Sequence, residues 1–330
     1  HERSRRQRQM CIRDSMIFSG FFRSILSGEG DMKFPMMVAG LGTILNIILD
    51  PIFIFDLESL GGFGFGLGIA GAAMATVISQ VVVFIVFIFM LFFKNHSYIS
   101  FNLSDFTFST DIIWDIIKVG LPASLSMIVM AVGQGVFNKI LVHISVNTVA
   151  AYQVAGRLDM LVFLPIFSIA ASLTTLVGMF YGAKEYGALR YIIKYGIFSA
   201  LLITIISSTI VYTFAGHVVR FFTDDASIVI IAVNFLQIFA FAYPFISVGI
   251  TTGRVLQGLG KGLPVLIITI VRVLGVSAPL ALFFVFIMDK TVEWVWYSMM
   301  LSTIVAFGIG LTWLISTLKT LPTSGQSLNN

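Results

Sequence analysis

The chain has 330 residues, of which 58% are hydrophobic and only 11% are charged, and its mean hydropathy is +0.98. Soluble domains carry about 25% charged and roughly 45–50% apolar residues. The composition therefore excludes water-soluble enzymes, nucleic-acid binders and disordered tails, and it predicts an integral membrane protein. In such a protein the net charge of +4 matters through the positions of Lys and Arg relative to the membrane spans.

The first residues, 1–15 (HERSRRQRQMCIRDS), differ in composition from everything that follows. The run RQRQMCIRDS resembles translated sequencing-adapter sequence, and a native basic cytoplasmic arm is the alternative. We expect residues 1–15 to be non-native or disordered. The single cysteine, Cys11, excludes a disulfide framework, and no Cys/His cluster has metal-ligand spacing, so we expect no cofactor.

Eight apolar stretches are long enough to cross a membrane, which takes about 20 residues of helix. Residues 16–27 have the composition expected for the end of one more span. The stretches lack the alternation of a membrane β-barrel, so the fold class predicted is an all-α bundle of about eight full transmembrane helices plus a stub. The eight spans are 34–55, 67–93, 116–142, 147–181, 191–217, 228–256, 263–288 and 293–318.

The basic residues indicate the orientation of these spans. If the loop with Lys33 is cytoplasmic, the loops on that side hold eight Lys and Arg residues, and the opposite side holds only Arg220 and Lys290. Cytoplasmic loops carry an excess of Lys and Arg. We therefore predict a multi-pass protein of the cell (inner or plasma) membrane whose C-terminus is cytoplasmic.

Two of the predicted cytoplasmic turns have similar sequences. Residues 23–35 and 254–264 each contain Arg, a G-x-G turn, a Lys and a Pro that opens the next span. Two ordinary turns are the alternative, because Pro is common in the first helical turn. Six spans separate the copies, which favours two parallel six-helix halves and predicts an N-terminally truncated twelve-helix protein.

The repeat also predicts the domain organisation. The remainder of the N-terminal lobe (the end of helix 4, then helices 5 and 6) would occupy residues 16–94. A cytoplasmic linker, the C-terminal lobe with helices 7–12, and a cytoplasmic tail would follow at 95–115, 116–318 and 319–330.

A carboxylate inside the first apolar stretch is the most informative polar residue. Asn46 and Asp50 have i, i+4 spacing and share one helical face. Pro51 disturbs the preceding turn and can leave a carbonyl free to coordinate, and Thr76 can present a hydroxyl to a neighbouring helix. Since ionisable residues in spans are costly and by default functional, we predict a site for a hard cation or a proton. The alternative is a helix-end Asp near the headgroups.

Polar residues also gather in the second half of the chain. A water-filled substrate cavity and structural hydrogen bonds between helices are equally compatible with them, and Arg157 could pair with Asp159 or with a neighbouring helix. Arg254, Arg272 and the Tyr243-Pro244 pair are interpreted as structural charges and a kink. The candidate cavity residues are Gln134, Asn138, Lys139, Gln153, Arg157, Asp159 and Tyr243.

Seven motifs in order, from about residue 16 to the C-terminus, resemble the multidrug and toxic compound extrusion (MATE) transporters. They are Arg23…Gly28-x-Gly30-Asp31-x-Lys33-x-Pro35, Asn46-x-x-x-Asp50-Pro51, Gly68-Ile-Ala-Gly71-Ala-Ala-Met-Ala-Thr76, Gly120-Leu-Pro122-Ala, Arg157-Leu…Leu164-Pro165, Gly178-x-x-Tyr-Gly182-Ala183-Lys184 and Leu256-Gln257-Gly258-x-Gly260.

This resemblance implies two six-helix lobes that open alternately to each side of the membrane and export drugs or xenobiotic organic cations in exchange for H⁺ or Na⁺. Asn46, Asp50 and Thr76 match three of the family's cation-coupling residues in the N-terminal lobe, and a fourth, on helix one, would lie in the missing part. A C-terminal coupling acid used by another branch corresponds to Met130 here. A coupling site in the C-terminal lobe is therefore not expected.

The expected partners are amphipathic or cationic small molecules and the lipid bilayer, with no nucleic acid and no resident metal beyond a possible Na⁺ at Asn46 and Asp50. A flippase for lipid-linked sugars or another amphipathic substrate is the alternative within transport, and it would be expected to line its cleft with many cations. An enzyme is not expected, because no nucleophile–base pair or carboxylate pair lies at membrane depth.

Overall fold

The computed structural model describes residues 17–56, 64–93 and 107–322. Within them the chain consists of helices joined by short turns and loops, with one isolated bridge between Asp56 and Phe65. Eight of the described helices are long and apolar enough to cross a membrane, which confirms the predicted all-α class and the predicted spans. Large hydrophobic side chains cover much of the surface, as expected where lipid tails are the solvent.

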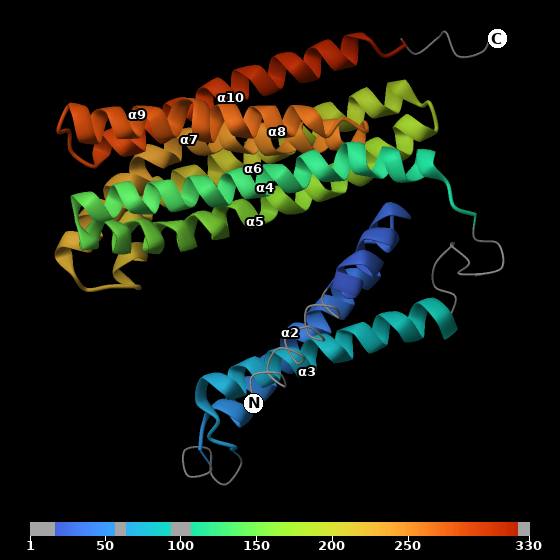
Figure 1. The fold of residues 1–330 in the computed structure, drawn as a ribbon, viewed down its shortest axis with the longest axis horizontal. Coiled ribbons are helices and arrows are strands. Elements are labelled where there is room, and N and C mark those ends of the chain that lie inside the picture. The colour runs from blue at the N-terminus through green and yellow to red at the C-terminus, as the bar shows by residue number, and fades with distance from the viewer. Residues whose placement is uncertain (1–16, 57–63, 94–106, 323–330) are drawn as a thin grey trace. The chain divides into compact units, whose positions relative to one another are not determined.

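The chain divides into two compact units, one up to Phe108 and one from Ser109 onward. In the first unit, α2 (Lys33–Ile54) packs along α3 (Gly68–Ile88), which continues as the π-helical η1 (Phe89–Phe93) (Figure 1). The helical residues 17–28 complete a small core with Phe22 and Leu26 buried against Val83 and Phe87.

The second unit is a bundle built around one helix, α7 (Ala226–Gly258), which packs against α5, α6, α8 and α10 (Figure 1). Its other elements are α4 (Thr110–Ile144), α5 (Val146–Gly182), α6 (Tyr186–Arg220), α8 (Leu263–Ile270), η3 (Val271–Ser277), α9 (Ala278–Leu282), η4 (Phe283–Ile287) and α10 (Glu293–Lys319). Aromatic rings fill the core beside α7. The ring of Phe235 lies 4.9 Å from that of Trp296, and the ring of Tyr152 stacks on Trp296 at 5.8 Å.

The two repeated turns found in the sequence have the same backbone geometry. In the first copy, the N–H of Gly30 donates to the carbonyl of Ser27 at 3.1 Å, and the N–H of Asp31 donates to the carbonyl of Leu26 at 3.0 Å. In the second copy, the N–H of Gly260 donates to the carbonyl of Gln257 at 2.9 Å, and the N–H of Lys261 donates to the carbonyl of Leu256 at 2.8 Å. The second glycine of each turn has a positive φ, 90° at Gly30 and 76° at Gly260. These hydrogen bonds and dihedral angles are those of the Schellman motif that ends many helices. The two turns of similar sequence thus share one backbone geometry. Helix α5 ends in the same way at Lys184, so this common helix ending does not by itself establish a repeat.

Some boundaries differ from the sequence expectations. Helix α4 begins at Thr110, so the predicted linker to residue 115 includes its first turns, because Ser109 is extended and Thr110 is already helical. The π-helical segments were not foreseen, since no sequence period distinguishes them from α-helix. Residues 1–16, most of the linker (94–106) and the tail from 323 lie outside the described residues.

The central helix α7 begins with a side-chain cap. One carboxylate oxygen of Asp225 accepts from the Ser227 N–H at 2.8 Å, the Ser227 hydroxyl at 2.7 Å and the Ile228 N–H at 3.3 Å. These hydrogen bonds, first that of the Ser227 hydroxyl, hold the pKa of Asp225 below its usual value. Asn147 of α5 donates to the same Ser227 hydroxyl at 2.7 Å, which joins the two helix ends.

The contact between α2 and α3 should not tolerate a Cβ at Gly71, because that atom would overlap the carbonyl of Phe53. We expect Gly71→Ala to destabilise the chain by about 1–3 kcal/mol. The matched control is Gly40→Ala, where nothing lies within 4 Å of the added Cβ. The temperature at which half of the purified protein leaves the monodisperse gel-filtration peak measures the effect. Equal values for the two variants would contradict the close approach.

The capping of α7 by Asp225 predicts that the stability of the fold depends on pH. Since its pKa is lower in the folded state, the carboxylate stabilises the fold at neutral pH, and this contribution is lost as the pH falls from about 3.9 through the folded-state pKa. Asp225→Ala should lower the melting temperature at pH 7 and have less effect near pH 3. Asp225→Asn keeps a capping oxygen and should show a flatter pH profile. A deficit of Asp225→Ala that does not change with pH would refute this account.

Candidate functional site

The first candidate site lies in the N-terminal unit and joins three residues predicted from the sequence. The Asn46 amide Nδ2 donates to Asp50 Oδ1 at 3.2 Å along α2 and lies 3.5 Å from the Thr76 hydroxyl on α3. The Thr76 hydroxyl donates to the carbonyl of Ala72 at 3.0 Å, so its lone pairs face Asn46. The amide oxygen of Asn46 and the second oxygen of Asp50 accept no hydrogen bond from a described residue. Both oxygens can ligate a cation, and the carboxylate can also take a proton.

Local sequence explains why these groups meet. The i, i+4 spacing places Asn46 and Asp50 one turn apart, and α2 continues through Pro51 for a last turn to Ile54. Small residues at the crossing bring α3 close: Gly71 faces the Phe53 backbone, and Gly42 faces Val83. Close packing of this kind lets short side chains such as Thr76 reach the facing helix.

A cavity of about 200 Å³ adjoins this trio. Asn46 and Thr76 line it together with Thr43, Gln80 and Arg23, the last from the helical residues 17–28. The guanidinium of Arg23 gives this cavity one positive charge. The cavity is thus lined mainly by polar side chains, although the two helices are apolar over most of their length.

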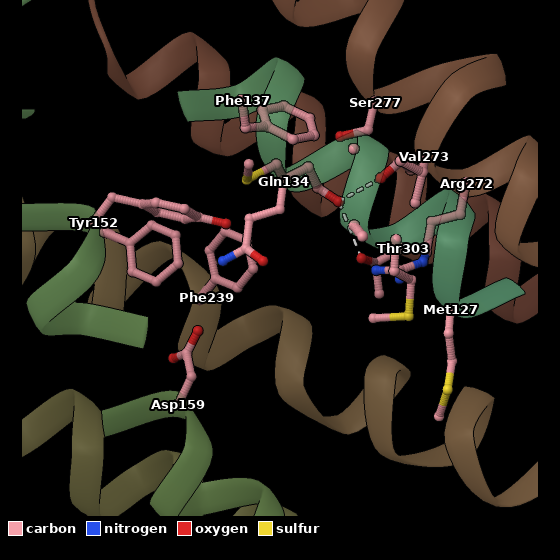
Figure 2. Close-up of a pocket in the computed structure, with 16 residues that line it drawn as sticks. Met127, Gln134, Phe137, Tyr152, Asp159, Phe239, Arg272, Val273, Ser277 and Thr303 are labelled. Atoms are coloured by element: carbon pink, nitrogen blue, oxygen red, sulfur yellow. Dashed lines mark hydrogen bonds between the residues drawn. The ribbon is translucent and has the colours of Figure 1, made fainter. Parts of the chain in front are cut away.

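The second candidate site is a cavity of about 560 Å³ inside the C-terminal unit (Figure 2). This volume lies within the range of about 300–1,000 Å³ typical of small-molecule sites. Its apolar lining is rich in Met and Phe: Met127, Met130, Phe137, Phe235, Phe239 and Met299. Its polar lining comes from four helical elements, α4, α5, η3 and α10, and includes Gln134, Tyr152, Asp159, Arg272, Ser277, Ser302 and Thr303.

The sequence-predicted cavity residues divide into three groups. Gln134 and Asp159 line the cavity, and the hydroxyl of Tyr243 on α7 donates a hydrogen bond to Asp159 Oδ1. Asn138 and Gln153 do not line it but join α4 to α5, with Gln153 Nε2 3.5 Å from Asn138 Oδ1. Lys139 and Arg157 are exposed and outside its lining. The carboxylate of Asp159 therefore pairs with Tyr243 and forms no ion pair with Arg157.

Sequence reasoning missed the cavity's cation. The sequence interpretation of Arg272 is a structural charge, but the structure places it in the lining of this cavity, together with Met130. The signal was available, because an arginine interrupts the apolar stretch 263–288 and such residues are by default functional. Tyr152 and Ser277 gave no comparable signal.

The described residues include no group of three or more His, Cys, Asp or Glu side chains that could hold a metal ion. Lys118 and Asp115, exposed near the start of α4, form the ion pair found in the described part of the chain, at 3.2 Å. In the first site, the amide of Asn46 and the hydroxyl of Thr76 surround the carboxylate of Asp50. In the second site, uncharged amide and hydroxyl groups line the cavity together with Asp159 and Arg272.

Three kinds of comparison agree on the relatives of this chain. A sequence model described as MatE matches residues 122–283. A probable multidrug resistance protein NorM of Thermotoga maritima is 30% identical over 83% of this chain and 58% of its own length. The multidrug export protein MepA of Staphylococcus aureus is 32% identical over 68% of this chain and 48% of its own length. The chain thus spans about half the length of these curated relatives.

A solved structure described as the outward-facing conformation of a multidrug resistance MATE family transporter of the MOP superfamily is similar in three dimensions. It is 32% identical, with a TM-score of 0.84 over 94% of this chain and 68% of that one. The relatives are named as multidrug resistance and multidrug export proteins, and the eight spans among the described residues make this chain a multi-pass membrane protein. The fold, the ordered motifs and these similarities together show that the chain belongs to the MATE family of transporters.

Proposed function

We propose that the protein containing this chain is a secondary active antiporter that exports drugs or xenobiotic organic cations in exchange for H⁺ or Na⁺. The observation that carries the proposal is the contact of Asn46, Asp50 and Thr76 across α2 and α3, at 3.2 and 3.5 Å. The printed names of the relatives, a multidrug resistance protein and a multidrug export protein, support the substrate class.

The coupling ion would bind at this trio. Asp50 supplies a carboxylate oxygen, Asn46 an amide oxygen and Thr76 a hydroxyl oxygen, and hard cations such as Na⁺ prefer oxygen ligands. A proton could instead neutralise Asp50. Either ion lowers the cost of holding the carboxylate in an apolar surrounding, and the second oxygen of Asp50 is open to it.

Exchange follows if the ion and the drug prefer different states of the protein. A ligand shifts a conformational equilibrium only by its differential affinity for the two states. In the proposed cycle, the occupied Asp50 site favours one of the inward-facing and outward-facing states, and the drug favours the other. The two units would act as the halves of this alternating-access cycle, in the plasma membrane, with the C-terminus in the cytoplasm.

The alternative of a lipid-linked-sugar flippase finds less support. A pyrophosphate-linked substrate would call for several cations, and among the described residues that line the 560 Å³ cavity Arg272 is the one cation. We therefore retain small amphipathic molecules as the proposed substrates.

The carboxylate of Asp50 should be required for coupling. In efflux-deficient cells that express the complete reading frame, Asp50→Asn should abolish ion-driven efflux of ethidium, because an amide cannot exchange a proton and binds Na⁺ weakly. Asp56→Asn, six residues further along the chain, is the control with the same charge change. Both variants should reach the membrane at the wild-type level. Wild-type efflux by Asp50→Asn would overturn the site assignment.

The hydroxyl of Thr76 should tune ion affinity. Thr76→Val preserves the shape of the side chain and removes one oxygen ligand, so several-fold more Na⁺, or a lower pH, should be needed for half-maximal efflux in proteoliposomes. Efflux at saturating ion should remain. Thr43→Val, which also lines the small cavity but donates to Ala39 of its own helix at 3.0 Å, is the matched control. Identical ion dependence of the two variants would contradict the role of Thr76.

A further inference from the structure

The 560 Å³ cavity of the C-terminal unit is lined by several hydrogen-bond donors that have no partner among the described residues. The guanidinium of Arg272, the amide of Gln134 and the hydroxyls of Tyr152 and Ser277 line it, and none of these side chains hydrogen-bonds to another described residue. In a span, where water is scarce, unpaired donors of this kind are costly. Their gathering in one cavity indicates a ligand that supplies acceptors.

The backbone brings two of these donors together. Arg272 lies in η3 (Val271–Ser277), a seven-residue π-helical segment, and such segments are rare and frequent at functional sites. On the facing helix, Gly133 approaches the side chain of Val273 so closely that a Cβ at Gly133 would overlap it. Gln134 and Arg272, each next to one member of this contact, therefore enter the same cavity (Figure 2).

Among the described residues that line the cavity, the one carboxylate, that of Asp159, does not pair with Arg272. Tyr243 donates to Asp159 Oδ1, and the carboxylate of Asp159 forms no ion pair with Arg272 within 4 Å. Figure 2 shows Asp159 on α5, apart from Arg272 on η3. The hydroxyls of Ser302 and Thr303 both donate to the carbonyl of Met299 in their own helix, at 2.7 and 3.0 Å. The charge of Arg272 is thus left without a counter-ion among the described residues.

We propose that this cavity binds an amphipathic molecule through an anionic group, of which a carboxylate is the simplest. The guanidinium of Arg272 presents a planar fork of donors that matches a carboxylate, and Gln134 and Ser277 can donate to its remaining lone pairs. The apolar body of the ligand lies against Met127, Met130 and Phe239, whose flexible and aromatic side chains accept varied shapes.

This inference rests on the proposed transport function and adds molecules that carry a carboxylate, including zwitterions, to its proposed substrates. Cations without an anionic group would not engage Arg272. Binding and efflux can be measured separately, so the two proposals can fail independently.

The test uses three fluorescent probes with the same dansyl group: dansylglycine, an anion; dansylglycinamide, its neutral counterpart; and dansylcadaverine, a cation. The complete reading frame is purified into nanodiscs of neutral phosphatidylcholine, and binding is followed by dansyl fluorescence, with empty nanodiscs subtracted. Wild-type protein should bind dansylglycine at least ten-fold more tightly than dansylglycinamide. Arg272→Gln should remove this preference, and Arg272→Lys should keep part of it.

The control is Lys194→Gln, which removes one positive charge from the exposed side of α6 and should leave the preference unchanged. Gel filtration of each variant checks folding. Equal wild-type binding of the acid and the amide would overturn the inference even where Arg272→Gln fails to fold, as would an unchanged preference in Arg272→Gln. If the protein binds or exports dansylcadaverine and neither of the other two probes, the antiporter proposal remains and the proposal of a carboxylate ligand is refuted.

Discussion

The hydrocarbon core of the membrane offers no hydrogen-bond partners, and this constraint shapes the whole structure. The backbone is satisfied within helices, and most buried hydroxyls return to a carbonyl one turn earlier, as Ser79 does to Ala75 at 2.9 Å and Thr204 to Ala200. Two groups of polar side chains among the described residues depart from this pattern, one around Asp50 and one around Arg272, and the functional proposals rest on them.

Glycine positions the polar groups in both units. Gly71 lets α3 approach the backbone of Phe53, and Gly133 lets α4 approach Val273. In each case the residue that carries the chemistry is near the contact: Thr76 is five residues along α3, and Gln134 is next to Gly133. Without attraction between apolar faces in lipid, small residues and the packing that they permit determine which helices meet.

The two proposed sites have complementary chemistry. The site at Asn46, Asp50 and Thr76 offers oxygen acceptors to a cation, whereas the larger cavity offers N–H and O–H donors to an anionic group. They belong to different units of the chain, so an ion at one site and a drug at the other would communicate through a conformational equilibrium that both ligands bias. Such coupling is reciprocal: each ligand changes the affinity for the other by the same factor.

The sequence by itself determined the features that depend on neighbours along the chain: the eight spans, the pairing of Asn46 with Asp50 one turn later, the two glycine turns, and, through ordered motifs, the family. Tertiary structure decided the partners that are distant in sequence. Tyr243 reaches Asp159 across 84 positions, and Arg272 enters a cavity rather than serving as a structural charge. The physical reason is that a helix period fixes which residues share a face, but the glycine contacts and π-helical turns that orient one face toward another arise only from packing.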